Sequence, residues 1–125
     1  MSSSIVAYLM YKLGCSHPFR ISRILLLAEW EAKERLGRRL TDFHYVMEDF
    51  GFYVEELKDI IDGFVEEGCA EKVEEEKCIR YLCEAPEIPE EVKELLDEVI
   101  ERVKDVSDRE LNRMVIRDPR YGEGL

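Results

Sequence analysis

The fold of this chain turns on residues 50–68, "FGFYVEELKDIIDGFVEEG". Apolar residues recur in this stretch every three or four positions, which predicts an amphipathic helix with one face in the core. The predicted core face consists of Val54, Leu57, Ile60, Ile61, Phe64 and Val65. Gly68 suits the left-handed residue just past a helix end. Most of the outward positions are acidic, so the sequence predicts a helix that presents negative charge to its surroundings.

A β-hairpin is predicted directly after this helix. The segments "CAEKV" (69–73) and "CIRYLC" (78–83) are separated by "EEEK", which is the pattern of two short antiparallel strands joined by a turn. Before the helix, "DFHYVM" (42–47) fits either a short strand or the first turn of a helix.

Two helices are predicted at the N-terminal end of the chain. The first covers 4–13, with Ser4 as its cap and Gly14 just past its end. The second runs from about 19 to 36, and its apolar stripe is so wide that this helix must be central in the fold.

The C-terminal part predicts two more helices. Pro89 suits a first helical position, and a regular apolar stripe then marks an amphipathic helix over about 89–104. Ser107 and Glu110 form a capping box that opens a short helix, which ends near Arg117 and before Pro119.

Three helices followed by a two-stranded hairpin is the order of a winged helix-turn-helix, in which the hairpin is the wing. The predicted fold class is therefore mainly α with a small β-hairpin, a winged helix-turn-helix with additional C-terminal helices. A chain of 125 residues is expected to form a single domain. We expect its core to cover about 4–84 and the helical extension about 89–118.

The stretch "FGFYVEELKDIIDGFVEEGCAEK" resembles a segment of the Panacea family of SocA-like antitoxins and of related archaeal winged-helix proteins. In that family an aromatic-Gly-Pro-aromatic turn starts a helix that ends in Leu-x-x-x-Gly and leads into a strand. "IVAYLMYKLG" and "ISRILLLAEWEAKERLGRRLTDFHY" are similar to its opening helices, and "DVSDRELNRMVIRDPRY" to its closing motif. The resemblance implies an antitoxin or proteolysis-adaptor domain without catalytic residues.

Charge is distributed unevenly along the chain, whose formal net charge is −11. Residues 1–47 carry a net charge of +3, residues 48–110 a net charge of −15, and residues 111–125 a net charge of +1. The middle of the chain therefore repels a phosphate backbone and favours a basic protein partner or a second copy of the chain. The predicted partner-binding residues are Glu55, Glu56, Lys58, Asp59, Asp62, Glu74, Glu75 and Glu76.

The alternative function is a transcriptional regulator that binds DNA as a dimer. Its candidate nucleic-acid-binding residues are Arg20, Arg23, Lys33, Arg35, Arg38, Arg39, Arg113 and Arg117, with Arg120 in the same tail. This hypothesis gains if the basic residues form one exposed surface and loses if they are interleaved with acids such as Glu29, Glu31 and Glu34. The predicted helix 89–104 suits a homodimer contact under either hypothesis.

No pattern in the sequence predicts catalysis, a cofactor or a metal. The four cysteines include no Cys-x-x-Cys pair, and His17 and His44 are too scattered for a zinc signature. Cys69 and Cys83 fall opposite each other in the predicted hairpin, where they can form a disulfide or act as small buried apolar residues. We therefore expect a protein that is not an enzyme.

The remaining composition suggests where the protein works. The longest apolar run, "ILLLA" (24–28), is too short to span a bilayer, and the N-terminus lacks a basic signal-peptide region. We therefore expect a soluble, cytoplasmic protein. One Asn, no Gln and 38% charged residues are typical of a thermophile, here expected to be archaeal.

Overall fold

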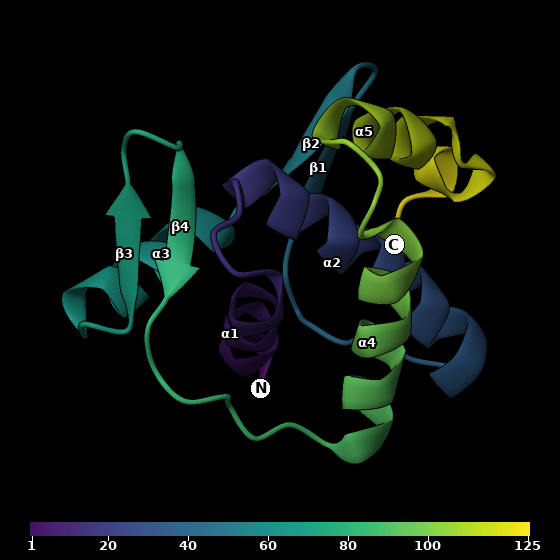
Figure 1. Ribbon diagram of the computed structural model, residues 1–125. Helices are drawn as coiled ribbons and strands as arrows, with labels where there is room; N and C mark the ends of the chain where they lie inside the picture. Colours follow the sequence, from purple (N-terminus) through teal and green to yellow (C-terminus); the bar gives the residue numbers. More distant parts are fainter.

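Helix α2 (Pro18–Leu36) is the centre of the fold, and every residue from Ile21 to Trp30 is buried. The computed structural model describes all 125 residues (Figure 1). Helices α1 (Ser2–Leu13), α4 (Glu90–Val103) and α5 (Asp108–Arg117) pack against α2. The prediction of a central second helix is confirmed.

Two antiparallel hairpins complete the architecture. Strand β1 (Tyr45–Glu48) pairs with β2 (Gly51–Val54), and β3 (Ala70–Val73) pairs with β4 (Cys78–Tyr81). Helix α3 (Leu57–Glu66) connects the two hairpins along the chain. In Figure 1 the β1–β2 hairpin lies beside α5, whereas β3–β4 lies on the other side of the molecule beside α3.

The first hairpin corrects the prediction for residues 50–68. The segment 51–54 is a strand, and the helix begins only at Leu57. Phe52 and Val54 are buried while Tyr53 between them is exposed, which is the two-residue period of a half-buried strand. Val54 misled the sequence interpretation because it stands three positions before Leu57, a spacing that also fits a helical face. The undecided segment "DFHYVM" contributes strand β1.

The structure supports a mainly α fold with two small antiparallel sheets. The β3–β4 hairpin follows α3 as predicted, but the β1–β2 hairpin lies between α2 and α3, where a helix-turn-helix has a short turn. The winged-helix assignment stays a prediction.

Helix α4 uses its apolar stripe inside the chain. Its buried residues are Val92, Leu95, Leu96, Val99 and Val103, and α4 packs on α2. The apolar face that suggested a homodimer contact over 89–104 is therefore not available to a second copy.

Two helix starts differ slightly from prediction. Helix α1 begins at Ser2, and no side chain caps it, so Ser4 is not its cap. Pro89 is the residue before α4 and not its first helical residue. Ser107 caps α5 as predicted, because the Glu110 backbone N–H donates to Ser107 Oγ at 3.1 Å, while the Glu110 carboxylate bonds Arg113 and does not complete the capping box. Pro119 ends α5 and opens a short 3-10 helix, Pro119–Glu123.

All four cysteines form disulfides. Cys69 and Cys83 are joined at the open end of the β3–β4 hairpin, with their Cα atoms 5.0 Å apart. Cys15 and Cys78 join the α1–α2 loop to β4, with Cα atoms 5.3 Å apart. Of the two alternatives left open for Cys69 and Cys83, the structure has the disulfide, and the Cys15–Cys78 disulfide was not predicted. None of the helices combines the length and the hydropathy needed to cross a membrane.

Candidate protein interface

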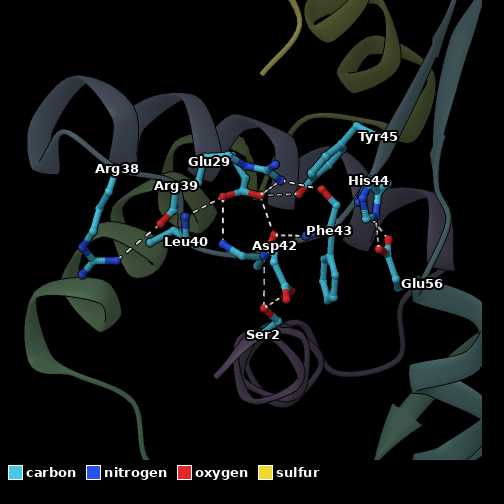
Figure 2. Close-up of polar contacts among 11 residues, drawn as sticks. Ser2, Glu29, Arg38, Arg39, Leu40, Asp42, Phe43, His44, Tyr45 and Glu56 are labelled. Atoms are coloured by element: carbon cyan, nitrogen blue, oxygen red, sulfur yellow. Dashed lines mark hydrogen bonds and ion pairs between the residues drawn. The ribbon is translucent and has the colours of Figure 1, made fainter.

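The segment that leads to the interface is held on α2 by one buried carboxylate, Glu29, whose side chain is fully buried (Figure 2). Glu29 Oε1 accepts hydrogen bonds from the backbone N–H groups of Leu40, at 2.6 Å, and Thr41, at 3.1 Å. Thr41 Oγ1 donates to Glu29 Oε2 at 2.5 Å. These bonds fix the loop after α2 onto the helix.

Two further donors complete the environment of Glu29. The Arg39 guanidinium donates to Glu29 Oε2 at 2.8 Å and to the Phe43 carbonyl oxygen at 2.7 Å. The Tyr45 hydroxyl donates to Glu29 Oε2 at 3.0 Å, and burial, followed by the nearby negative charge, raises the pKa of Tyr45. The buried charge is thus paired and hydrogen-bonded, as its desolvation requires. From the sequence alone, Glu29 is only an acid that could pair with a basic residue on the helix surface. Its position inside the apolar run "ILLLAEW" was a signal that it is buried.

His44 and Glu56 join β1 to the start of α3. The His44 backbone N–H donates to Glu56 Oε1 at 2.9 Å, and the His44 ring Nδ1 is 2.5 Å from Glu56 Oε2. The hydrogen bond with Glu56 raises the pKa of His44. Burial alone would raise the pKa of Glu56, but the hydrogen bonds from His44 outweigh it and lower that pKa. The first turn of α3 is therefore fixed relative to the Glu29 network.

The structure divides the predicted partner-binding residues among three places. The first is a shallow hollow of about 530 Å³ beside the start of α3, which we call the acidic hollow. Its acidic residues are Asp42, Glu55, Glu56 and Asp59. A hydrogen bond from Ser2 lowers the pKa of Asp42. Glu55 and Asp59 are exposed, and neither forms an ion pair, so their charge is available to a partner.

The second place is an apolar groove of about 230 Å³ on the other flank of the first turns of α3. Its apolar lining comes from α2, β2, α3 and β4: Pro18, Phe19, Phe52, Tyr53, Val54, Leu57, Ile61 and Ile79. Phe19 is 60% exposed and Tyr53 is 53% exposed, which leaves large apolar surfaces open to solvent. Lys58 and Lys72 stand at the edge and both pair with Asp62, at 2.9 and 3.3 Å.

The third place is the turn of the β3–β4 hairpin, where Glu74, Glu75 and Glu76 are exposed. None of the three lines the acidic hollow or the apolar groove. The sequence therefore grouped residues that the fold separates. The groove itself was missed because its lining comes from three separate parts of the chain, residues 18–22, 52–62 and 72–79.

The candidate nucleic-acid-binding residues are mostly occupied by internal contacts. Arg20 pairs with Asp108 at 2.7 Å, and Arg38 with Glu91 at 3.1 Å. Arg23 is buried and donates to Asn112 Oδ1 at 2.9 Å, so a phosphate cannot reach it.

The remaining arginines follow the same pattern. Arg35 pairs with Glu31 and Glu98, Arg39 with Glu29, Arg113 with Glu110, and Arg120 with Glu34 and Asp118. Among the nine candidates only Lys33 and Arg117 form no ion pair or side-chain hydrogen bond. The basic residues are interleaved with acids, which is the arrangement that disfavours the DNA-binding alternative.

The chain matches the family described as "Antitoxin SocA-like, Panacea domain" over residues 21–119. It belongs to the Panacea family. The matched range contains α3, both hairpins and all the acids of the acidic hollow, so the candidate interface lies largely within the Panacea domain. No curated protein and no solved structure matches the chain.

Proposed function

We propose that this Panacea protein is a non-enzymatic interaction module, antitoxin-like or adaptor-like, that binds a basic protein through the start of α3. The observation that carries the proposal is the pairing of two open surfaces on the flanks of the same helical turns. Glu55 and Asp59 offer unpaired negative charge on one flank, and Phe19 and Tyr53 offer apolar surface on the other.

The two surfaces have different tasks in this proposal. Apolar side chains of the partner enter the groove, because burying aromatic anchors supplies most of the free energy of a typical interface. The acids guide a basic partner to the right orientation and discriminate against acidic ones. Binding acts by mass action, since the bound partner is masked or presented for as long as the complex lasts.

The winged-helix assignment is part of this proposal, with α3 in the position of a recognition helix and β3–β4 as the wing. DNA is disfavoured as the ligand because residues 53–77 carry ten acids against three lysines. A second copy of this chain is also disfavoured at the hollow, because a two-fold contact would bring Glu55 and Asp59 against identical acids.

A capture experiment tests the proposal. The tagged chain is expressed in its own host, and captured proteins are quantified for the wild type and for the variant Glu55→Lys with Asp59→Lys. Glu56 and Asp62 are left intact because they bond His44 and two lysines. The matched control, Glu84→Lys with Glu87→Lys, changes the charge equally at exposed residues outside the interface.

We expect the wild type and the control to enrich the same basic protein, and the interface variant to lose it. Equal enrichment of that protein by all three would show that the acidic hollow does not take part in binding. Sequence-specific retardation of the upstream region of its own gene, tighter than micromolar, would favour the regulator instead.

The groove is tested separately with Phe19→Ala, which removes an exposed aromatic side chain at its edge. Truncation of an interface anchor typically costs 2 kcal/mol or more, so we expect affinity for the captured partner to fall about 30-fold. Phe50→Ala is the control, since Phe50 is 81% exposed but does not line the groove. A similar loss in both variants would point to general surface stickiness.

A further inference from the structure

Three potential metal ligands meet where the α1–α2 loop contacts the β3–β4 hairpin. The Sγ atoms of Cys15 and Cys78 and a carboxylate oxygen of Glu76 lie within 4.8 Å of one another. Glu76 Oε2 is 3.7 Å from Cys78 Sγ. A sulfur at about 2.3 Å and an oxygen at about 2.1 Å from one tetrahedral zinc ion lie about 3.6 Å apart. The spacing of Cys78 and Glu76 therefore fits a zinc ion. The sulfurs of Cys15 and Cys78 are joined as a disulfide in this structure, and after reduction they would have to separate to about 3.8 Å to bind the same ion.

The backbone holds the two cysteines together independently of the disulfide. The Ser16 N–H donates to the Ile79 carbonyl oxygen at 3.1 Å, and the Ile79 N–H donates to the Ser16 carbonyl oxygen at 2.9 Å. Ser16 follows Cys15, and Ile79 follows Cys78, so this reciprocal pair fixes both cysteine positions. These backbone bonds do not involve the sulfur atoms, so they can form whether or not the sulfur–sulfur bond is present.

The cluster borders a pocket that opens to solvent, with Glu76 exposed, Cys15 partly exposed and Cys78 buried. Cys15, Glu76 and Cys78 line a pocket of about 400 Å³ that also contains His17 and Lys77. A small reductant and a hydrated cation can both enter such a pocket. The other disulfide, Cys69–Cys83, has no third potential ligand at this spacing.

We propose that this cluster is a zinc site when the protein is reduced and a disulfide when it is oxidised. A dithiol converts the Cys15–Cys78 bond to two thiols and becomes a cyclic disulfide itself. Zn²⁺ then replaces the two thiol protons, which pass to solvent, and forms two Zn–S bonds and one Zn–O bond with Glu76. A water molecule takes the fourth position. No zinc pattern is visible in the sequence because Cys15 and Cys78 are 63 residues apart.

His17 is close by but is not the fourth ligand. Its Nδ1 accepts a hydrogen bond from the Phe19 N–H at 3.1 Å and so caps α2. With Nδ1 used as an acceptor, the proton of the neutral ring sits on Nε2, which leaves no free lone pair for a metal. The helix cap therefore excludes His17 from the site.

The test uses the full chain reduced with a phosphine, which competes for metal less than a dithiol does. Co²⁺ is the spectroscopic probe and Zn²⁺ its competitor. We expect one Co²⁺ per reduced chain, a thiolate-to-cobalt charge-transfer band, displacement by zinc, and no binding by the oxidised chain. Zinc should also protect Cys15 and Cys78, but not Cys69 and Cys83, from alkylation.

Variants assign the ligands. Removing a residue that only hydrogen-bonds to a metal ligand typically lowers metal affinity about 10–100-fold. Cys15→Ser removes a ligand itself, so it should lower zinc affinity by at least about 100-fold. Glu76→Gln should lower it at least about tenfold, whereas Glu75→Gln in the same turn should not. His17→Asn, which can still cap α2, should leave affinity unchanged.

Three results would overturn the proposal: no band in the reduced chain, equal alkylation of all four cysteines with zinc present, or unchanged affinity in Cys15→Ser. The double variant Cys69→Ser with Cys83→Ser is the control and should keep the band. If circular dichroism shows Cys15→Ser to be unfolded, the alkylation pattern of the wild type decides alone.

Discussion

A buried carboxylate such as Glu29 is stable only when its charge is paired and its hydrogen bonds are complete. Its donors come from Arg39, Leu40, Thr41 and Tyr45, so one side chain on α2 organises the whole loop that leads to β1 (Figure 2). The loop in turn positions His44 and, through it, the start of α3. The geometry of the proposed interface thus depends on a residue that is itself fully buried.

Glu29→Gln should lower the free energy of unfolding by about 3 kcal/mol. Arg39 loses its counter-charge, and the side-chain NH2 group of the new glutamine cannot accept the hydrogen bonds that the surrounding groups donate to Glu29. Urea unfolding measures this difference. Glu34→Gln on the same helix is the control, and since Glu34 makes only an exposed pair with Arg120, it should cost less than about 1 kcal/mol. Equal losses in the two variants would contradict a special role of Glu29.

The pH dependence of the His44–Glu56 contact follows from two shifted pKa values. The pKa of His44 is raised by Glu56, so the charged pair adds stability below the unfolded value of about 6.5, and this contribution is lost as the pH rises through the folded pKa. The pKa of Glu56 is lowered, so the same contribution is lost as the pH falls through that lower value. NMR titration should show a His44 pKa above the unfolded value of about 6.5 in the wild type, and a pKa close to that value in Glu56→Gln. An unshifted His44 in the wild type would contradict the contact.

At the scale of elements, the spacing of apolar residues predicted the helices that bury one face in the core. Helices α2 and α4 were predicted because each buries a face of regular spacing, and α5 was predicted from its capping box. The β1–β2 hairpin was missed because its strands have only four residues each, too few to separate a two-residue period from a helical one. The acidic residues were found from sequence, but their division among three surfaces depends on how α3 and the hairpins pack.

The two disulfides should differ in their contribution to stability. Cys15 and Cys78 close a loop with a sequence separation of 63, against 14 for Cys69 and Cys83. Because a longer loop restricts the unfolded chain more, removing the first should cost about 4 kcal/mol and the second about 3 kcal/mol. Chemical unfolding of Cys15→Ala with Cys78→Ala, and of Cys69→Ala with Cys83→Ala, compares them. A larger loss for the short loop would contradict this order.

At the scale of the whole molecule, charge and apolar surface are arranged so that one region remains open. Most of the candidate arginines are paired with acids, for example Arg20 with Asp108, Arg35 with Glu98 and Arg120 with Glu34, which leaves little basic surface for a phosphate backbone. The unpaired acids and the exposed aromatics instead meet around the first turns of α3. The Panacea family membership agrees with a protein partner.

The most direct measurement of the central claim is a calorimetric titration of the captured partner at about 0.05 and 0.3 M salt. The proteins compared are the wild type, Glu55→Lys with Asp59→Lys, and the control Glu84→Lys with Glu87→Lys. Close charge pairs across an interface contribute about 1.5 kcal/mol or more each, so the interface variant should bind at least about 100-fold more weakly. The wild type and the control should match each other, and both should weaken at the higher salt because screening shortens the range of the charges. Wild-type affinity in the interface variant, with no effect of salt, would contradict binding through the acidic start of α3.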